Sequence, residues 1–137
     1  MPNSPSWKIE ETVKLAQILA TRGVDLIDVS TGGNHPKQKV IGGPAYQAPF
    51  AHEVKKAVKD KALVGSVGVI TEGPLAESLL QEGKADVIFV ARHFQRRPGL
   101  VWDWADELGV SIKVANQIEW GFAGRGKHKK SGHTSLP

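Results

Sequence analysis

The segment that most constrains the fold is residues 62–92, where two apolar, β-branched runs flank a stretch with helical spacing of leucine and alanine. The runs, residues 63–70 and 85–91, are apolar on both faces, which is typical of parallel strands that helices cover. Pro74 is typical of a helix start, because a proline in the first turn lacks only an N–H that has no helical partner there. Gly83 is typical of a helix end. The segment therefore predicts a strand–helix–strand unit.

The rest of the chain predicts further units of the same kind. In chain order these are a helix over residues 9–21, a strand over 24–29, a long loop over 30–46, a helix over 48–59, a helix over 100–108 and an irregular segment over 111–122. In the helix over 100–108 we expect Leu100, Val101, Trp104 and Leu108 to be buried. A loop as long as residues 30–46 is usually functional or mobile in a compact domain.

The alternation of helices and strands requires a parallel sheet with right-handed crossovers, so the predicted fold class is α/β. The three predicted strands are too few for a closed barrel, which needs eight strands and about 250 residues. They are also few for a doubly wound sheet. The predicted order starts with a helix that no strand precedes. We therefore expect the chain to form part of a larger structure.

Length and composition fit one soluble domain. The chain has 137 residues, of which 40% are apolar and 23% charged. No apolar run approaches the ~20 residues of a membrane span, and residues 1–11 lack the basic and apolar regions of a signal peptide. No cysteine is present, which excludes disulfides and thiol chemistry. We therefore predict a cytoplasmic protein with no membrane partner.

The net charge of +4 comes from the end of the chain. Residues 121–137 contain four of the 18 basic residues and none of the 14 acidic ones, so the rest of the chain is balanced. A basic folded surface for nucleic acid is therefore not indicated. We interpret residues 123–137 as a basic, disordered tail rather than a binding arm, and residues 1–122 as the folded part.

Candidate site residues follow the two apolar strands, where parallel α/β folds bind their ligands. Arg92 directly follows the second strand and has two interpretations. It either forms an ion pair with an acid such as Asp86 or Glu72, or binds a phosphate together with the backbone N–H groups of residues 91–93 at a helix start. Gly68, at the end of the first strand, favours the phosphate, because a side chain there would crowd a ligand.

Other patterns indicate no chemistry. Residues 121–127 come close to a phosphate-binding P-loop, but no apolar strand precedes them and no helix follows, so we reject that interpretation. The five histidines show no metal-ligand spacing. Asp28 lies nearer the carboxyl end of its strand than Asp25 and is the better placed of the two for a site. No paired carboxylates, Ser-His-Asp arrangement or Cys-His pair is evident, so we predict no catalytic residue and no metal ligand.

Five motifs stand in a characteristic order and spacing along the chain. They are VDLIDVSTGG, PAYQAPFAHEVK, VGVITEG, ADVIFVAR and NQIEWGF. Together they resemble the C-terminal portion of the Old Yellow Enzyme family, in particular its branch of NADPH dehydrogenases and xenobiotic reductases. The likeness runs from about Ser6 to Phe122. It implies a (β/α)8 TIM barrel that holds FMN at the carboxyl ends of its strands, reduces FMN with NAD(P)H and passes hydride to an activated alkene.

The resemblance assigns this chain to the last three βα units of such a barrel and the helix before them. The positions that match the family's FMN phosphate site are Gly68, Ala91 and Arg92, with Ala91 in the place of a glycine. The family's catalytic residues, a His-His or His-Asn pair and a tyrosine, lie upstream of the matching region, so none falls in this chain. Trp120 stands where this branch carries an arginine that reaches into a neighbouring subunit.

The function implied by the resemblance is that of an FMN-dependent NAD(P)H oxidoreductase of the ene-reductase type, here as a C-terminal fragment. Its ligands would be FMN and a small activated alkene, with NAD(P)H as the reductant. Further partners would be a second copy of the chain or the missing barrel half. The alternative is a non-catalytic, truncated remnant or interaction module without independent activity.

Overall fold

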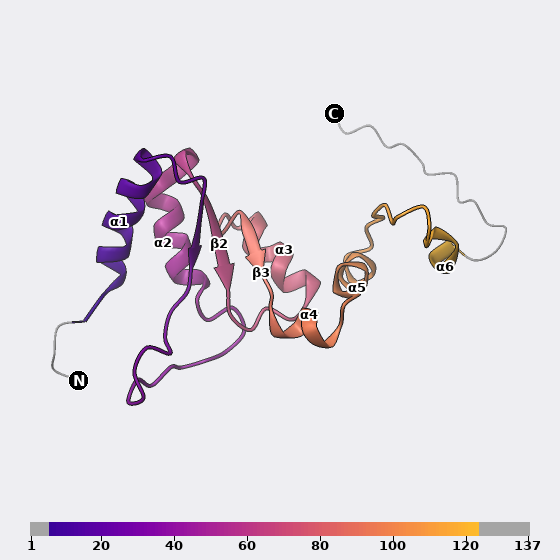
Figure 1. The fold of residues 1–137 in the computed structure, drawn as a ribbon, viewed down its shortest axis with the longest axis horizontal. Coiled ribbons are helices and arrows are strands. Elements are labelled where there is room, and N and C mark those ends of the chain that lie inside the picture. The colour runs from indigo at the N-terminus through magenta and orange to yellow at the C-terminus, as the bar shows by residue number, and fades with distance from the viewer. Residues whose placement is uncertain (1–5, 124–137) are drawn as a thin grey trace.

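The computed structural model describes residues 6–123, in which helices and strands alternate as predicted (Figure 1). The strands are β1 Leu26–Val29, β2 Leu63–Val67 and β3 Val87–Phe89. The helices are α1 Ile9–Thr21, α2 Ala48–Val58 with the 3-10 turn η1 Lys59–Lys61, α3 Gly73–Gln81, α4 Arg92–Arg96, α5 Leu100–Glu107 and α6 Glu119–Ala123. The basic tail predicted over residues 123–137 lies, apart from Ala123, outside the described residues.

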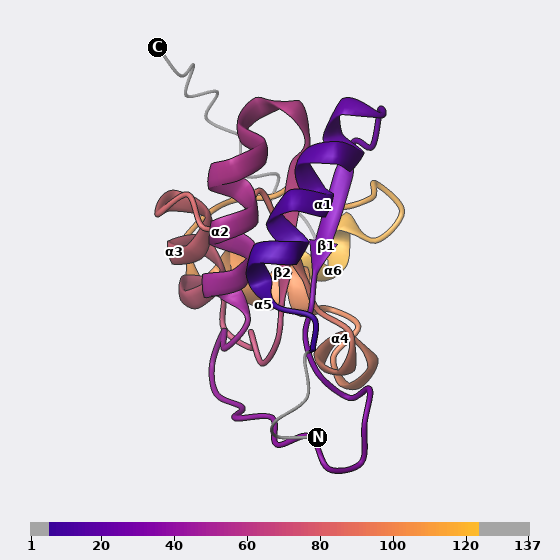
Figure 2. The same ribbon diagram turned by 90° about the vertical axis from the view of Figure 1, so that its left-hand side faces the viewer.

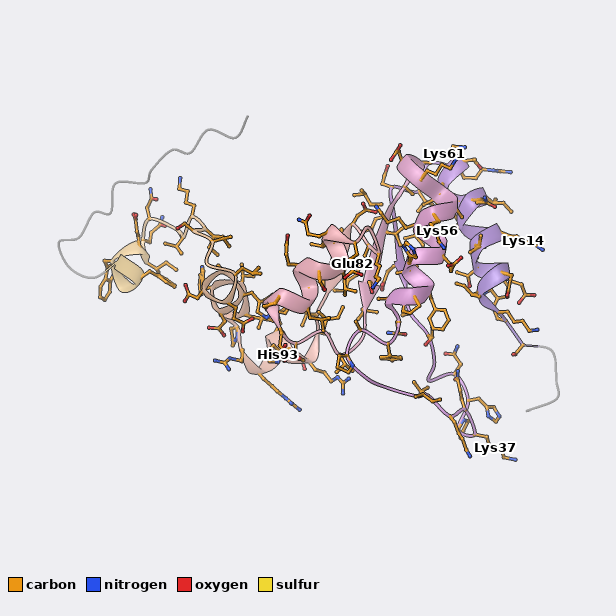
Figure 3. All side chains as sticks on the ribbon, turned by 180° about the vertical axis from the view of Figure 1, so that it is seen from behind. Lys14, Lys37, Lys56, Lys61, Glu82 and His93 are labelled. Carbon is orange, nitrogen blue, oxygen red and sulfur yellow. The ribbon has the colours of Figure 1, made fainter. Side chains whose placement is uncertain are left out.

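The strands form one parallel sheet in the order β1-β2-β3, which confirms the predicted α/β class. Leu26 of β1 is paired with Leu63 of β2, and Gly65 of β2 with Val87 of β3. Because the strands are parallel, their carboxyl ends lie at the same end of the sheet. The long loop between β1 and α2 and the start of α4 lie at that end (Figure 1). Lys37 marks the outer part of this loop (Figure 3).

Helices α1, α2 and α3 pack against the same face of the sheet. Val29 and Val64 belong to a buried cluster with Ala16 of α1 and Val54 of α2. A second cluster contains Ala76 and Leu79 of α3, with Ile88 of β3 and Trp104 of α5 packed against it. The register places all the sheet residues of both clusters on one face. Figure 2 shows α1 and α2 in front of the strands.

The opposite face of the sheet carries no helix among the described residues. Leu26, Leu63, Val67 and Phe89 point to this face, since they alternate with the residues that contact the helices. The ring of Phe89 lies over Gly65, and any side chain at Gly65 would collide with it. An apolar sheet face is therefore left partly open to solvent.

The start of α3 is fixed by α5. The N–H of Gly73 donates a hydrogen bond of 2.7 Å to Oε2 of Glu107. The indole N–H of Trp104 donates to the carbonyl of Thr71 at 3.4 Å. At the other end of α3, Gly83 adopts φ +65°, as its predicted place at the helix end requires. No helix within residues 6–123 has the length and hydrophobicity that crossing a bilayer would need.

The second strand is shorter than predicted. We expected it to run over residues 63–70, but β2 ends at Val67. Gly68 and Val69 follow with φ values of +118° and +51°, and a positive φ breaks the strand conformation. Because β-branched residues rarely adopt positive φ, the sequence gives no sign of this turn.

Three predictions for the C-terminal part were wrong. Residues 119–122, expected in an irregular or short extended segment, belong to the helix α6. Of the four residues expected to be buried in α5, Leu100 is buried, Trp104 and Leu108 are half-buried, and Val101 is 52% exposed. Val101 is exposed because α5 contacts the rest of the structure mainly through α3 and buries Ala105 beside Leu100. Arg92–Arg96 forms the helix α4, where only a short turn was expected. Beyond α5 the chain extends away from the sheet to α6, whose Phe122 ring lies 4.8 Å from the ring of Trp102.

The amino end of the sheet is held by a charged cluster. Asp86, directly before β3, accepts hydrogen bonds from the ammonium of Lys55 on α2 and, at 2.9 Å, from the N–H of Val64 on β2. Burial acts to raise the pKa of Asp86, but the hydrogen bonds from Lys55 and Val64 and the charge of Lys55 outweigh it, so its pKa is lowered. One carboxylate therefore joins α2, β2 and β3.

Candidate functional site: a cationic pocket at the carboxyl ends of two strands

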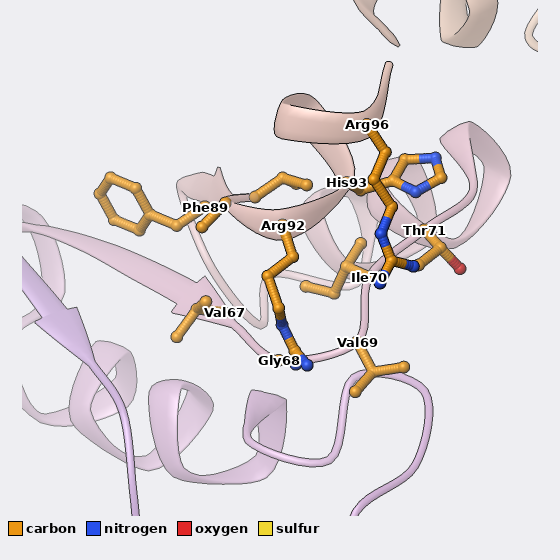
Figure 4. A pocket seen from close by; sticks show the side chains of 11 residues that line it. Val67, Gly68, Val69, Ile70, Thr71, Phe89, Arg92, His93 and Arg96 are labelled. Atoms are coloured by element: carbon orange, nitrogen blue, oxygen red, sulfur yellow. The ribbon is translucent and has the colours of Figure 1, made fainter. Parts of the chain in front are cut away.

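A pocket of about 320 Å³ lies beyond the carboxyl ends of β2 and β3. It is lined by residues 67–71, by residues 89–93 and by Arg96 of α4 (Figure 4). The three predicted phosphate-binding residues, Gly68, Ala91 and Arg92, are all among its lining residues. They come together because neighbouring parallel strands end side by side, although Ala91 lies 23 positions after Gly68 in the sequence.

Two arginines give the pocket a positive charge. Arg92 extends from the start of α4 toward residues 68–69, and Arg96 extends toward Thr71 (Figure 4). No Asp or Glu lines the pocket, and within residues 6–123 neither arginine forms an ion pair. Since guanidinium groups stay protonated and present fixed hydrogen-bond donors, the pocket is suited to an anion.

The ion-pair interpretation of Arg92 can be compared directly with this geometry. Asp86, one of the two acids considered, is bound to Lys55 at the opposite end of β3. Among the described residues, Glu72 also forms no ion pair with Arg92. The pairing of Arg92 with either acid is therefore wrong, and its guanidinium has no acidic partner among the described residues.

Arg96 was not identified from the sequence. It lies four positions after Arg92, and on a helix this spacing places two side chains on the same face. The sequence predicted a turn rather than a helix over residues 92–96, so it did not indicate that Arg92 and Arg96 share a face. His93 lines the same pocket, whereas His35 accepts a hydrogen bond from the N–H of Lys37 within the long loop.

The turn after β2 forms one wall of the pocket and has an unusual backbone. Val69 has φ +51°, a conformation that costs a β-branched residue free energy unless neighbouring groups impose it. At Gly68, with φ +118°, an added Cβ would lie 2.8 Å from Nε2 of Gln47 and 2.8 Å from Cε1 of Tyr46. Gly68 is thus required by its backbone and by these two neighbours, a reason that sequence reasoning, which considered only the ligand, did not find.

The remaining candidates lie elsewhere. Asp28 is exposed on the open sheet face and does not line the pocket. Trp120 lies on α6, and Figure 1 shows that α6 and the long loop lie at opposite sides of the described structure. Of the P-loop-like residues 121–127, only 121–123 are described. Within residues 6–123 no three acidic or histidine side chains are placed to hold a metal ion.

The lining residues determine what the pocket can do. Its walls combine apolar side chains such as Val67 and Phe89 with two guanidinium groups, an imidazole and the hydroxyl of Thr71. No Asp or Glu among the described residues lines the pocket, and no hydrogen bond joins the His93 imidazole to the Thr71 hydroxyl. The geometry therefore fits the binding and orientation of an anionic ligand better than catalysis by the chain's own residues.

Comparison with known proteins gives close relatives. The chain is 58% identical over 130 residues to an NADH:flavin oxidoreductase of Gibberella zeae, an alignment that covers 92% of this chain and 31% of that protein. It is 39% identical over 114 residues to an NADPH dehydrogenase of Geobacillus sp. and 37% identical over 115 residues to one of Bacillus subtilis, each covering 83% of this chain and 33% of the relative. The chain thus spans about a third of the length of these relatives. No family model matches it.

Proposed function

The predicted resemblance to the Old Yellow Enzyme family is confirmed by these named relatives, and from this relationship we propose that the chain is part of an FMN-dependent NAD(P)H oxidoreductase. Gly68, Ala91 and Arg92 would hold the phosphate of FMN in the pocket, and Arg96 would contribute a second guanidinium. When bound, FMN would supply hydride transfer from NAD(P)H to an activated alkene. The names of the relatives support a flavin and a nicotinamide, and FMN in particular is our proposal.

The observation that carries this proposal is the pair of guanidinium groups in a pocket without acids. A phosphate monoester is a doubly charged anion near neutral pH, and an arginine can bind two of its oxygens at once. Two arginines without protein partners among the described residues supply the matching charge. Ligands of parallel α/β proteins bind at this end of the sheet.

We also propose that residues 1–122 form the C-terminal part of a (β/α)8 barrel, of which the sheet is a section, with residues 123–137 as its tail. Parallel sheets in general bury both faces. Here α1, α2 and α3 cover one face of the sheet. On the other face, Leu26 and Leu63 are 40% and 51% exposed. In a closed barrel this second face points inward and is covered by side chains of the other strands.

Within this proposal, the chain's own residues bind and orient the cofactor. Arg92 and Arg96 would fix the phosphate end of FMN, while groups outside this chain would enclose the isoalloxazine ring, bind the substrate carbonyl and donate the proton. This division agrees with a pocket whose lining contains two arginines and, among the described residues, no acid. It also leaves the second candidate function, a non-catalytic remnant, as the outcome if the other part of the barrel is never supplied.

The proposal is tested by measuring FMN and riboflavin affinities in a protein that carries the complete barrel. Riboflavin lacks the phosphate and serves as the matched ligand. We expect Arg92→Ala to weaken FMN binding by about 1.5–3 kcal/mol and riboflavin binding little, since a charge-assisted bidentate contact to the phosphate is lost. Arg96→Ala should act in the same direction.

Arg97→Ala is the control. Arg97 is the neighbouring arginine, does not line the pocket and is paired with Asp103 at the surface. Its replacement should leave both affinities unchanged. Equal affinities for FMN and riboflavin in the unsubstituted protein, or an Arg92→Ala variant that binds FMN as before, would refute the assignment.

A further inference from the structure

The side chain of Gln47 joins three segments near the pocket. It is only 3% exposed, although it is polar and directly precedes α2. Its Oε1 accepts a hydrogen bond from the N–H of Thr31, two residues after β1. Its Nε2 donates a hydrogen bond of 3.0 Å to the carbonyl of Val67, the last residue of β2. One buried amide therefore holds the carboxyl ends of β1 and β2 against the start of α2.

The bond to Val67 lies directly before the turn that lines the pocket. The next two residues, Gly68 and Val69, have positive φ, and Val69 in particular would relax to an extended conformation if nothing held it. The main contacts that hold it come from residues 45–47. Besides the bond from Gln47, the N–H of Ala45 lies 3.4 Å from the carbonyl of Val69, and the Tyr46 ring lies against Gly68.

We propose that Gln47 is a positioning residue for anion binding: it holds residues 67–69 in the left-handed turn that forms the wall opposite Arg92. This inference rests on the proposed FMN phosphate site and adds a residue to it. Gln47 does not itself line the pocket, so it acts through the backbone that it fixes. With the turn in place, Gly68 presents its backbone to the pocket, and a phosphate can approach that backbone closely.

The choice of variants separates hydrogen bonding from packing. Gln47→Met keeps a side chain of similar length and volume but loses both hydrogen bonds, which leaves the Thr31 N–H and the Val67 carbonyl without their partner. Val54→Ala serves as the control. Val54 is a fully buried residue of the same helix that belongs to the core cluster with Ala16 and Val64 and does not line the pocket, so its truncation lowers stability through packing alone.

The experiment measures dissociation constants for FMN and for riboflavin by flavin fluorescence in the complete protein, with folding checked by circular dichroism. The ratio of the riboflavin constant to the FMN constant reports the phosphate contribution alone. In Gln47→Met we expect this ratio to fall at least about tenfold, the equivalent of one charge-assisted hydrogen bond, with riboflavin affinity nearly unchanged. In Val54→Ala the ratio should equal that of the unsubstituted protein.

Each other outcome is decisive. If the unsubstituted protein binds FMN no better than riboflavin, the proposed phosphate site fails and the role of Gln47 fails with it. If the unsubstituted protein prefers FMN and Gln47→Met keeps that preference, the phosphate site stands and the positioning role is refuted. Equal weakening of FMN and riboflavin in Gln47→Met would likewise refute it, because the residue would then serve general stability only.

Discussion

Asp86 should make one of the larger polar contributions to the stability of this fold, and replacing it tests the physical account of the amino end of the sheet. Its carboxylate accepts from the N–H of Val64, a residue whose exposure is 0%, and from Lys55. The side chains of Asp86 and Lys55 are 24% and 25% exposed, so both are mostly shielded from solvent. Substitution to alanine leaves a buried N–H and a partly buried ammonium without their partner.

The expected cost follows from these two losses. A hydrogen bond to a charged group contributes about 1.5–3 kcal/mol, and a partly exposed ion pair adds about 0.5–1 kcal/mol. Asp86→Ala should therefore lower the free energy of unfolding by about 2–4 kcal/mol at pH 7. Asp86→Asn keeps an acceptor oxygen for the Val64 N–H and should cost about half as much.

The pH dependence has a definite sign. The folded protein holds the pKa of Asp86 below the unfolded value of 3.8, so the carboxylate stabilises the fold above that pH. Its contribution is lost as the pH falls through the lower, folded pKa. The stability difference between the natural protein and Asp86→Asn should thus be full at pH 7 and shrink below about pH 4.

The assay is urea unfolding followed by tryptophan fluorescence at several pH values. Glu53→Gln is the control, because Glu53 also pairs with a lysine of α2, Lys56, but at the exposed surface, where an ion pair contributes little. We expect its unfolding midpoint at pH 7 to match that of the natural protein. The reasoning would be refuted if Asp86→Ala lowered the free energy of unfolding by less than about 0.5 kcal/mol. It would also be refuted if the loss stayed constant from pH 7 to pH 3.

Three further substitutions test other contacts by thermal or urea unfolding. Ser66 is fully buried and its hydroxyl has no hydrogen-bond partner among the described residues, so Ser66→Ala should raise stability by about 1 kcal/mol; a loss would mean that the hydroxyl has a partner. Glu107→Ala removes the acceptor for the Gly73 N–H and should cost about 1–2 kcal/mol, whereas the adjacent Asp106→Ala should cost little. Val69→Gly relieves the positive φ and should raise stability by up to about 1 kcal/mol, unless the residue is not held at φ +51° in solution.

The elements that the sequence predicted well are those fixed by local signals. α1 has the predicted bounds, and α2 and α5 end within a residue of the predicted positions. Helical spacing and glycines at the helix ends supply these signals within a few residues of the feature they determine. The meeting of Gly68 with Arg92 could also be predicted, since parallel strands in sequence order end side by side.

The features that were missed depend on contacts between distant parts of the chain. The early end of β2 requires Val69 at positive φ, which residues 45–47 impose from more than twenty positions away. The exposure of Val101 depends on which face of α5 meets α3. Gln47 looks like any polar residue before a helix until its two long-range hydrogen bonds are seen. No local pattern encodes such contacts, so the amino-acid sequence taken alone does not reveal them.

The two ends of the sheet carry different physical features. At the amino end, a carboxylate, an ammonium and a backbone N–H satisfy one another, which stabilises the fold. At the carboxyl end, two guanidinium groups lie in one pocket without acids, beside a turn held at positive φ. Like charges and a strained turn destabilise a protein in the absence of a ligand, and such features concentrate at binding sites. A phosphate bound there would neutralise the arginines and would have direct access to the backbone of the turn, so the proposed ligand accounts for both costs together.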